Sequence, residues 1–428
     1  MGRAKSESHT LVAMSATLVL FLMAGCAGPD AANDPNLTVF EGARLIVGDG
    51  SAPIEDAVFV VESGLFTQAG SRADVQVPAG AARVDLSGQT VMPAIVNAHV
   101  HLASTREERT DQLQHMAYYG AGMVVSLGQD SANVPFDMRD EVVPNGARFR
   151  TAGPGIVGPE PGRSEVPSWV TTEAEARTAV QELAALQVDF VKIWVDDRNG
   201  QYERLSPALY GAVIDEAHNH GLRVTAHIFR LEDAKGLLRA GIDAFAHGIR
   251  DQDIDDELVA LWRERPNVTL VPNLPGPGVA EDLSWLSGTV PAGTLQEMQE
   301  RSTDRPAAQA SFGIQARNLA RLNREGIRIA FGTDGSNPWA VHQEMEDMVR
   351  SGMSPAEVIV AATSSSAELM ELDDVGSVSA GRSADFIVLD ANPLVDITNT
   401  RRISTVYLRG TSVDRDALAA RFRGGASQ

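Results

Sequence analysis

Residues 94–102 read AIVNAHVHL, an apolar run that ends with two histidines at alternate positions, His99 and His101. Alternate residues of a β-strand point to the same side, so we expect both imidazoles to face the same way. Two imidazoles inside an apolar strand need a shared cation or several hydrogen-bond acceptors. The stretch therefore predicts a buried strand that ends at a metal site.

Short apolar runs of this kind alternate with helical stretches along the middle of the chain, which is typical of a parallel sheet of βα units. Eight such runs are present: 94–102, 122–127, 148–156, 190–195, 223–229, 244–247, 268–272 and 328–333. Helices are expected at 171–186 and at 207–220, the second ending before Gly221. Eight units predict an α/β fold, a (β/α)8 TIM barrel over residues 93–375.

The two ends of the chain share a different sequence pattern. Residues 37–92 and 376–420 contain short β-rich runs broken by Gly, Pro and Asp, with no helical period. A chain of 428 residues is long enough for a barrel of about 250 residues and a second unit. We therefore expect a small β-sandwich domain built from both ends of the mature chain.

The N-terminus has the pattern of an export signal. Arg3 and Lys5 precede an apolar run, residues 11–23, that is too short to span a bilayer comfortably. Small residues then lead to Cys26, the single cysteine, in a pattern that resembles the bacterial lipobox. This predicts a signal peptide over 1–25, lipidation of Cys26 and a flexible tether over 26–36; a plain signal peptide is the alternative. The protein is then exported and lipid-anchored at the cell envelope, in the periplasm or on the outer surface.

The net charge of -21, without any block of Lys or Arg, excludes a nucleic-acid partner. The membrane is expected to be contacted through the lipid anchor alone. The oligomeric state stays open, and a homo-oligomer is compatible with the sequence.

Polar residues also end other predicted strands. They are Lys192, His227, His247 and Asp334. In a barrel, side chains at the carboxyl ends of several strands converge on one pocket. We therefore expect this set to join His99 and His101.

The complete set, with Asp334 in the motif Gly332-Thr333-Asp334, resembles the amidohydrolase superfamily, in its prolidase-like and imidazolonepropionase-like branches. The resemblance extends over essentially all of the mature sequence and includes the segments VHQEME (341–346), GMSPAE (352–357) and GRSADF (381–386). One departure is Asn97, which stands where the family pattern PGxxDxHxH has an acid that usually supports the metal ligands.

The resemblance implies a binuclear metal centre. An ammonium has no lone pair, but burial lowers the pKa of Lys192, and its neutral amine can add carbon dioxide to form a carbamate that bridges two metals. His99, His101 and Asp334 would then hold one ion and His227 and His247 the other. Two divalent ions, zinc in the first place, suit these ligands. Asp334 would be the catalytic residue that accepts a proton from the bridging water.

These features predict a metal-dependent hydrolase that cleaves an amide or peptide-type C–N bond of a small molecule, such as a dipeptide or an N-acyl amino acid. The alternatives are a cyclic amide, lactone or ester as substrate, or a binding lipoprotein without catalysis. Phe229, Arg230, Arg250 and Asn273 follow predicted strands and are expected to contact the substrate. The long stretch 281–311 forms either a lid or a surface helix.

Overall fold

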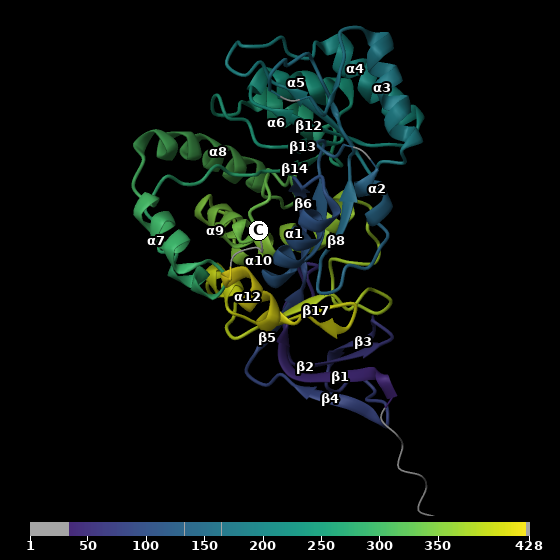
Figure 1. Cartoon of the computed structure of the whole chain (residues 1–428), viewed down its shortest axis with the longest axis vertical. Coiled ribbons are helices and arrows are strands. Elements are labelled where there is room, and N and C mark those ends of the chain that lie inside the picture. Colours follow the sequence, from purple (N-terminus) through teal and green to yellow (C-terminus); the bar gives the residue numbers. More distant parts are fainter. Residues whose placement is uncertain (1–33, 132, 164, 425–428) are drawn as a thin grey trace, which may run out of the picture.

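The computed structural model describes residues 34–131, 133–163 and 165–424 (Figure 1). The expected signal peptide, Cys26 and residues 27–33 lie outside the described residues. Strand β1 (Asp34–Leu45) includes the last three residues of the expected tether, 34–36. Among the residues that are described, no helix is both long and apolar enough to cross a membrane.

Strands from both ends of the chain form one mixed sheet, seen at the lower end of Figure 1 in purple and yellow. Its strand order is β18-β17-β16-β5-β1-β2-β3, and β4 pairs with β1. The strands are β1, β2 (Ile54–Glu62), β3 (Leu65–Ser71), β4 (Ala81–Asp85), β5 (Thr90–Pro93), β16 (Phe386–Leu389), β17 (Ile403–Leu408) and β18 (Thr411–Ser412). Strand β5 joins the two ends, because it pairs parallel with β1 and antiparallel with β16.

An aromatic cluster fills one face of this sheet. The ring of Phe40 stacks on Phe59 at 4.9 Å between centroids, and Phe386 stacks on Tyr407 at 4.5 Å. Because Phe386 also meets Phe40 edge-on, the cluster connects strands that are far apart in the sequence. The separate β-sandwich domain stays a prediction, since the hydrogen bonds define one continuous sheet.

The middle of the chain contains parallel strands in two sheets. One has the order β6-β7-β8 and the other β10-β9-β11-β12-β13-β14-β15. Their bounds are β6 (Ile95–Val100), β7 (Ala121–Ser126), β8 (Arg148–Thr151), β9 (Ile156–Val157), β10 (Ser168–Trp169), β11 (Val191–Val195), β12 (Val224–Ile228), β13 (Ala244–Ala246), β14 (Thr269–Val271) and β15 (Arg328–Ile329). Each of the eight predicted runs overlaps one of these strands. The run 148–156 was predicted as one strand but contains β8 and the first residue of β9, and β9 pairs in parallel with β10 and β11.

Backbone hydrogen bonds link the two parallel sheets at both edges. The amide of Ala98 in β6 donates to the carbonyl of Phe331, just after β15, at 2.8 Å, and the amide of Thr333 donates to His99 at 3.1 Å. At the other edge the amide of Asp189 donates to the carbonyl of Thr151 at 2.9 Å. The α/β class is therefore established, and closure into one (β/α)8 barrel stays a finer prediction.

Helices lie between these strands: α1 (Arg106–Tyr118), α2 (Val134–Met138), α3 (Glu173–Ala185), α4 (Pro207–Asn219), α5 (Leu231–Ala240), α6 (Asp256–Arg263), α7 (Ala292–Arg301), α8 (Pro306–Arg324), α9 (Ala340–Arg350), α10 (Pro355–Val360) and α11 (Ser366–Leu369), with α12 (Arg415–Arg423) near the C-terminus. Both predicted helices are confirmed. Thr172 and Glu175 form a capping box at the start of α3, and α4 ends before Gly221, whose φ is +70°.

The long stretch 281–311 forms the 3₁₀ turn η1 (Ser284–Gly288), helix α7 and the start of α8. Helix α7 contributes no buried residue to the core. This favours the surface-helix interpretation over the lid.

Candidate metal centre

His99 is the most enclosed of the predicted ligands. Its side chain is fully buried, and its Nδ1 lies 2.9 Å from Oδ1 of Asn273, which follows β14. A carbonyl oxygen accepts, so Nδ1 carries the proton and the lone pair is on Nε2, which has no hydrogen-bond partner. Asn273 therefore orients a predicted metal ligand, and its contact with the substrate stays a prediction.

Asn97 fills the position of the expected acid with two hydrogen bonds of its own. Its Nδ2 donates to Oγ1 of Thr333 at 2.9 Å, and its Oδ1 accepts from the amide of His99 at 3.2 Å. The side chain therefore ties β6 to the Gly332-Thr333-Asp334 motif, which is an orienting role that an amide can perform.

Asp334 lies at the centre of the histidines. Its Oδ1 is 3.2 Å from Nε2 of His99 and 3.2 Å from Nε2 of His101. Its Oδ2 is 3.5 Å from Nε2 of His247. Ligand atoms of His99, His247 and Asp334 all lie within 4.8 Å of one another. These three residues therefore form a compact set that one metal ion can join.

Two residues of this set have unusual backbone geometry. Asp334 has a φ of +51° and His247 a φ of +137°, and Asn273 beside them has +44°. L-residues rarely adopt positive φ, and such strained positions gather at functional sites. The strain turns these side chains inward at the carboxyl ends of the strands.

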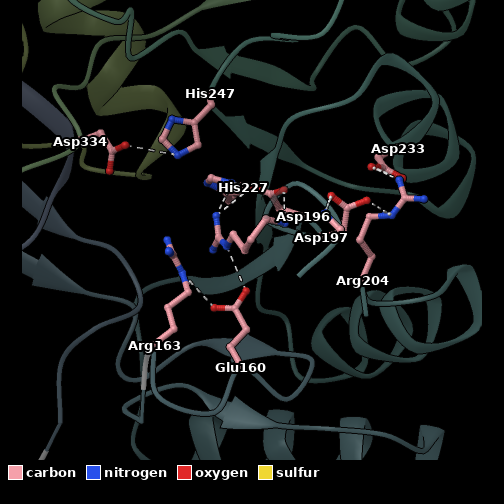
Figure 2. Close-up of polar contacts among 11 residues, drawn as sticks. Glu160, Arg163, Asp196, Asp197, Arg204, His227, Asp233, His247 and Asp334 are labelled. Atoms are coloured by element: carbon pink, nitrogen blue, oxygen red, sulfur yellow. Dashed lines mark hydrogen bonds and ion pairs between the residues drawn. The ribbon is translucent and has the colours of Figure 1, made fainter. Parts of the chain in front are cut away.

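His227 lies beside His247, with ring centroids 4.6 Å apart. Its Nε2, however, is 2.9 Å from Oδ2 of Asp196 and 3.0 Å from Nη1 of Arg198 (Figure 2). The structure thus brings His227 to the predicted site but directs this nitrogen to an ion pair rather than to Asp334.

Lys192 in β11 is completely buried, and its Nζ has no hydrogen-bond partner among the described residues. Burial lowers the pKa of its ammonium to about 7; the charge of Asp334 opposes this shift, and the charges of Arg250 and Arg198 add to it. Gly128 makes room for the side chain, because a Cβ there would lie 2.6 Å from Cγ of Lys192. A buried, unpaired lysine calls for a partner that these residues do not supply.

The donor atoms fit a divalent metal. Besides Nε2 of His99 and Nζ of Lys192, Nδ1 of His101 and Nδ1 of His247 are buried without a partner. Burial holds the pKa of His99 and of His247 well below the usual range, so both imidazoles are neutral and keep a lone pair. Imidazole nitrogens with a carboxylate are the ligands that borderline ions such as zinc take.

These residues face a cavity of about 150 Å³. The four histidines and Asp334 line it together with Glu160, Arg163, Trp194 and Arg198. Glu160, Arg163 and Arg198 were not among the predicted site residues. Arg198 lies three residues after the end of β11, and this position could have indicated a site residue. Glu160 and Arg163 belong to the loop between β9 and β10, where no sequence pattern indicates a site.

The other predicted substrate contacts lie outside the group that lines this cavity. Arg230 is exposed, and its Nη2 donates to Oδ2 of Asp197 at 2.8 Å. Phe229 is partly buried, and its carbonyl accepts from the amide of Arg250 at 2.9 Å. The Nε of Arg250 is buried without a hydrogen-bond partner. Of the three, Arg250 alone keeps an unsatisfied polar group beside the site.

Comparison with known proteins agrees with this arrangement. The amidohydrolase family model matches residues 90–413, so the chain belongs to the amidohydrolase family. It is 25% identical over 387 residues to an imidazolonepropionase of Deinococcus radiodurans, with 84% of this chain and 92% of the relative covered. It is 23% identical over 419 residues to an ochratoxinase of Aspergillus niger, covering 85% and 83%.

A solved structure is similar over almost its whole length. The crystal structure of a putative prolidase from Bifidobacterium longum aligns with a TM-score of 0.74 and 27% identity, covering 92% of this chain and 100% of that one. The family and these relatives establish hydrolase chemistry on C–N bonds as the class to which the chain belongs.

Proposed function

We propose that the protein is a binuclear metal-dependent hydrolase that cleaves an amide or peptide-type C–N bond. One observation carries the proposal: His99, His247 and Asp334 converge within 4.8 Å next to a fully buried Lys192 whose Nζ has no hydrogen-bond partner among the described residues. Burying an unpaired lysine costs stability, and a metal-bridging carbamate formed with carbon dioxide accounts for it.

His99, His101 and Asp334 would hold one ion, His227 and His247 the other, and carbamylated Lys192 both. When bound, two zinc-type ions polarise a carbonyl and make hydroxide available at neutral pH. For His227 to serve as a ligand through Nε2, this atom must give up its contact with Asp196 at 2.9 Å.

Asn273, Asn97 and Asp334 then have separate roles in the reaction. Asn273 fixes the tautomer of His99, and Asn97 fixes the position of the Thr333 loop. Asp334 accepts the proton of the attacking water on a carboxylate oxygen and returns it to the leaving nitrogen. No covalent bond to the enzyme is needed, so the carbonyl carbon is attacked once and the C–N bond breaks in a single cycle.

A dipeptide or an N-acyl amino acid is the substrate we favour, and the prolidase-like neighbour supports it. A cyclic amide, or a lactone or ester, is the second candidate, and the similarity to an imidazolonepropionase favours it. A closed (β/α)8 barrel with an appended β-sandwich is the fold we propose for this activity, since backbone hydrogen bonds link both edges of the parallel sheets.

The activity is tested with purified protein loaded with zinc. We expect about two ions per chain and turnover of at least one member of a panel of N-acyl amino acids, dipeptides, cyclic amides and lactones, with chelated protein as the inactive control. Metal binding without turnover of any member supports a binding lipoprotein instead. Protein without metal and without activity refutes the proposal.

We also propose export and lipid anchoring through Cys26, supported by the sequence pattern alone. The Cys26→Ser variant is expected to leave the membrane fraction. An intact mass that shows an unmodified N-terminus at another residue contradicts the anchor and leaves the enzyme proposal unaffected.

A further inference from the structure

We propose that Arg163 and Arg198 bind a carboxylate of the substrate, so that the enzyme selects acids such as N-acylated amino acids over the corresponding neutral amides. The inference rests on the proposed hydrolase function and names its substrate class. It comes from a part of the cavity that the metal centre does not use.

A buried carboxylate holds both guanidiniums in place. The side chain of Glu160 is 3% exposed; its Oε1 accepts from Nε of Arg198 at 3.0 Å, and its Oε2 lies 3.3 Å from Nε of Arg163. Because Glu160 engages the two Nε atoms, it leaves both Nη groups of Arg163 and Nη2 of Arg198 without an ion pair in the described part of the chain. Figure 2 shows the guanidinium of Arg163 pointing from its loop toward the space between Asp334 and His227.

The two arginines differ in their remaining contacts. Nη1 of Arg198 donates to Oδ2 of Asp196 at 2.8 Å and contacts His227. Arg163 makes no side-chain hydrogen bond with any residue in the described ranges, and half of its side chain, 49%, is exposed toward solvent and the cavity. Arg163 therefore has a free planar fork, which is the group that binds carboxylates with two parallel hydrogen bonds.

Positive charges outnumber negative charges around Arg163 and Arg198. Arg163 and Arg198 share Glu160, and Asp196 pairs with Arg198. Arg250 does not line the cavity, but its charge acts on the neighbouring Lys192, so it adds a third guanidinium. In the described part of the chain no carboxylate lies within 4.0 Å of Arg250, and its Nε is buried without a hydrogen-bond partner. With Asp334 assigned to the metal centre, three cations face two anions. An excess positive charge beside a small cavity, in a chain of net charge -21, marks a place for an anion.

The position of this anion relative to Asp334 indicates which part of the substrate it belongs to. Asp334, the proposed proton acceptor, and Arg163 line the same cavity of about 150 Å³. A small substrate whose scissile amide lies at Asp334 therefore places a nearby carboxylate at the arginines. Binding through a charged fork fixes the orientation of the amide as well as its affinity.

The test uses Arg163, because Arg198 also contacts a predicted metal ligand. The probes are the N-acetyl derivatives of alanine, leucine, phenylalanine and proline, each beside its C-terminal amide. Acetate release gives kcat/KM, and calorimetry gives affinity without relying on turnover. The variants are Arg163→Gln, which keeps hydrogen bonding without charge, and Arg163→Lys, which keeps the charge without the fork. Arg263→Gln is the control, since Arg263 pairs with Glu325 on the surface outside the cavity.

We expect the wild-type protein to prefer acids over amides, and Arg163→Gln to lose about 10- to 100-fold of that preference, chiefly in KM, with unchanged metal content. Arg163→Lys is expected to keep part of it, and Arg263→Gln all of it. Equal binding of acids and amides by the wild-type protein, or an unchanged preference in folded Arg163→Gln, overturns the inference. Acid-selective binding that needs Arg163, without hydrolysis of any probe or panel member, leaves the carboxylate site standing and refutes only the hydrolase.

Discussion

Exchanging Asp334 for Asn separates the proposed proton transfer from the packing of the site. The two side chains have nearly the same size, and Asn keeps an oxygen that can remain near Nε2 of His99 and His101, which now lie 3.2 Å away. The backbone at this position has a φ of +51°, a region that Asn tolerates better than most residues. The Asp334→Asn protein is therefore expected to fold and to bind substrate with little change.

The amide cannot accept a proton from the attacking water. General acid–base groups contribute about 10²- to 10⁴-fold, so kcat should fall by that factor, which corresponds to about 3 to 5 kcal/mol in the barrier. Initial rates are measured at saturating substrate and saturating metal, with metal content determined in the same sample. Asp253→Asn, which alters a surface ion pair with Arg317, is the control. A fully metal-loaded Asp334→Asn enzyme with a near wild-type rate refutes the assignment and makes His247 the next candidate.

Three further predictions follow from buried groups. Lys192→Ala should lose at least one of the two metal ions, and bicarbonate should speed metal reconstitution of wild-type apoprotein but not of the variant; full metal content and full rate in Lys192→Ala argue against a carbamate. Arg109→Met should cost about 3 to 5 kcal/mol in urea unfolding, because Arg109 and Asp130 pair at 2.5 Å with both side chains fully buried; a loss below about 1 kcal/mol means that Asp130 finds another partner. Burial, helped by the charge of Arg421, lowers the pKa of His115 to about 4, so the unfolded chain binds a proton that the folded chain does not, and stability is lost as the pH falls from about 6.5 toward 4. His115→Phe should therefore lose less Tm between pH 7 and pH 5 than the wild-type protein, whereas the surface variant His220→Phe should keep the wild-type slope; equal slopes in all three proteins contradict the burial argument.

Much of the parallel sheet could be predicted because its signal is local. Strand β6, which contains His99, is buried on both faces, as a strand covered on both sides is, and each predicted run overlaps a strand. The last strand is shorter than predicted: β15 spans only Arg328–Ile329, although Ala330 still donates to Leu270 of β14, and residues 331 and 333 bond to β6 instead. Strand β10 was missed, and β9 was joined to β8 in one predicted run, because two residues are too few to show a period.

The candidate ligands could be selected from the sequence because the histidines and Asp334 lie near or just after the ends of predicted strands, which converge; Lys192, the second residue of β11, lies near the start of its strand. The hydrogen bond of Asn273 to His99 was not predicted, because Asn273 has a φ of +44° and no pattern in the sequence reports that angle; its predicted contact with the substrate stays a prediction. The contact between Glu160 and Arg163 arises inside an irregular loop, where only the fold brings it to the cavity.

The mixed sheet can be completed only after strand β16 has been synthesised, because β16 pairs with one edge of β5. The partner of β5 on one side, β1, is made shortly before it, whereas its partner on the other side, β16, lies about 300 residues further along the chain. Until those last residues have been synthesised, the nascent chain carries an open strand edge next to its aromatic cluster, and open edges invite wrong pairing. Any product that ends before Phe386 lacks the partner that covers this edge of β5.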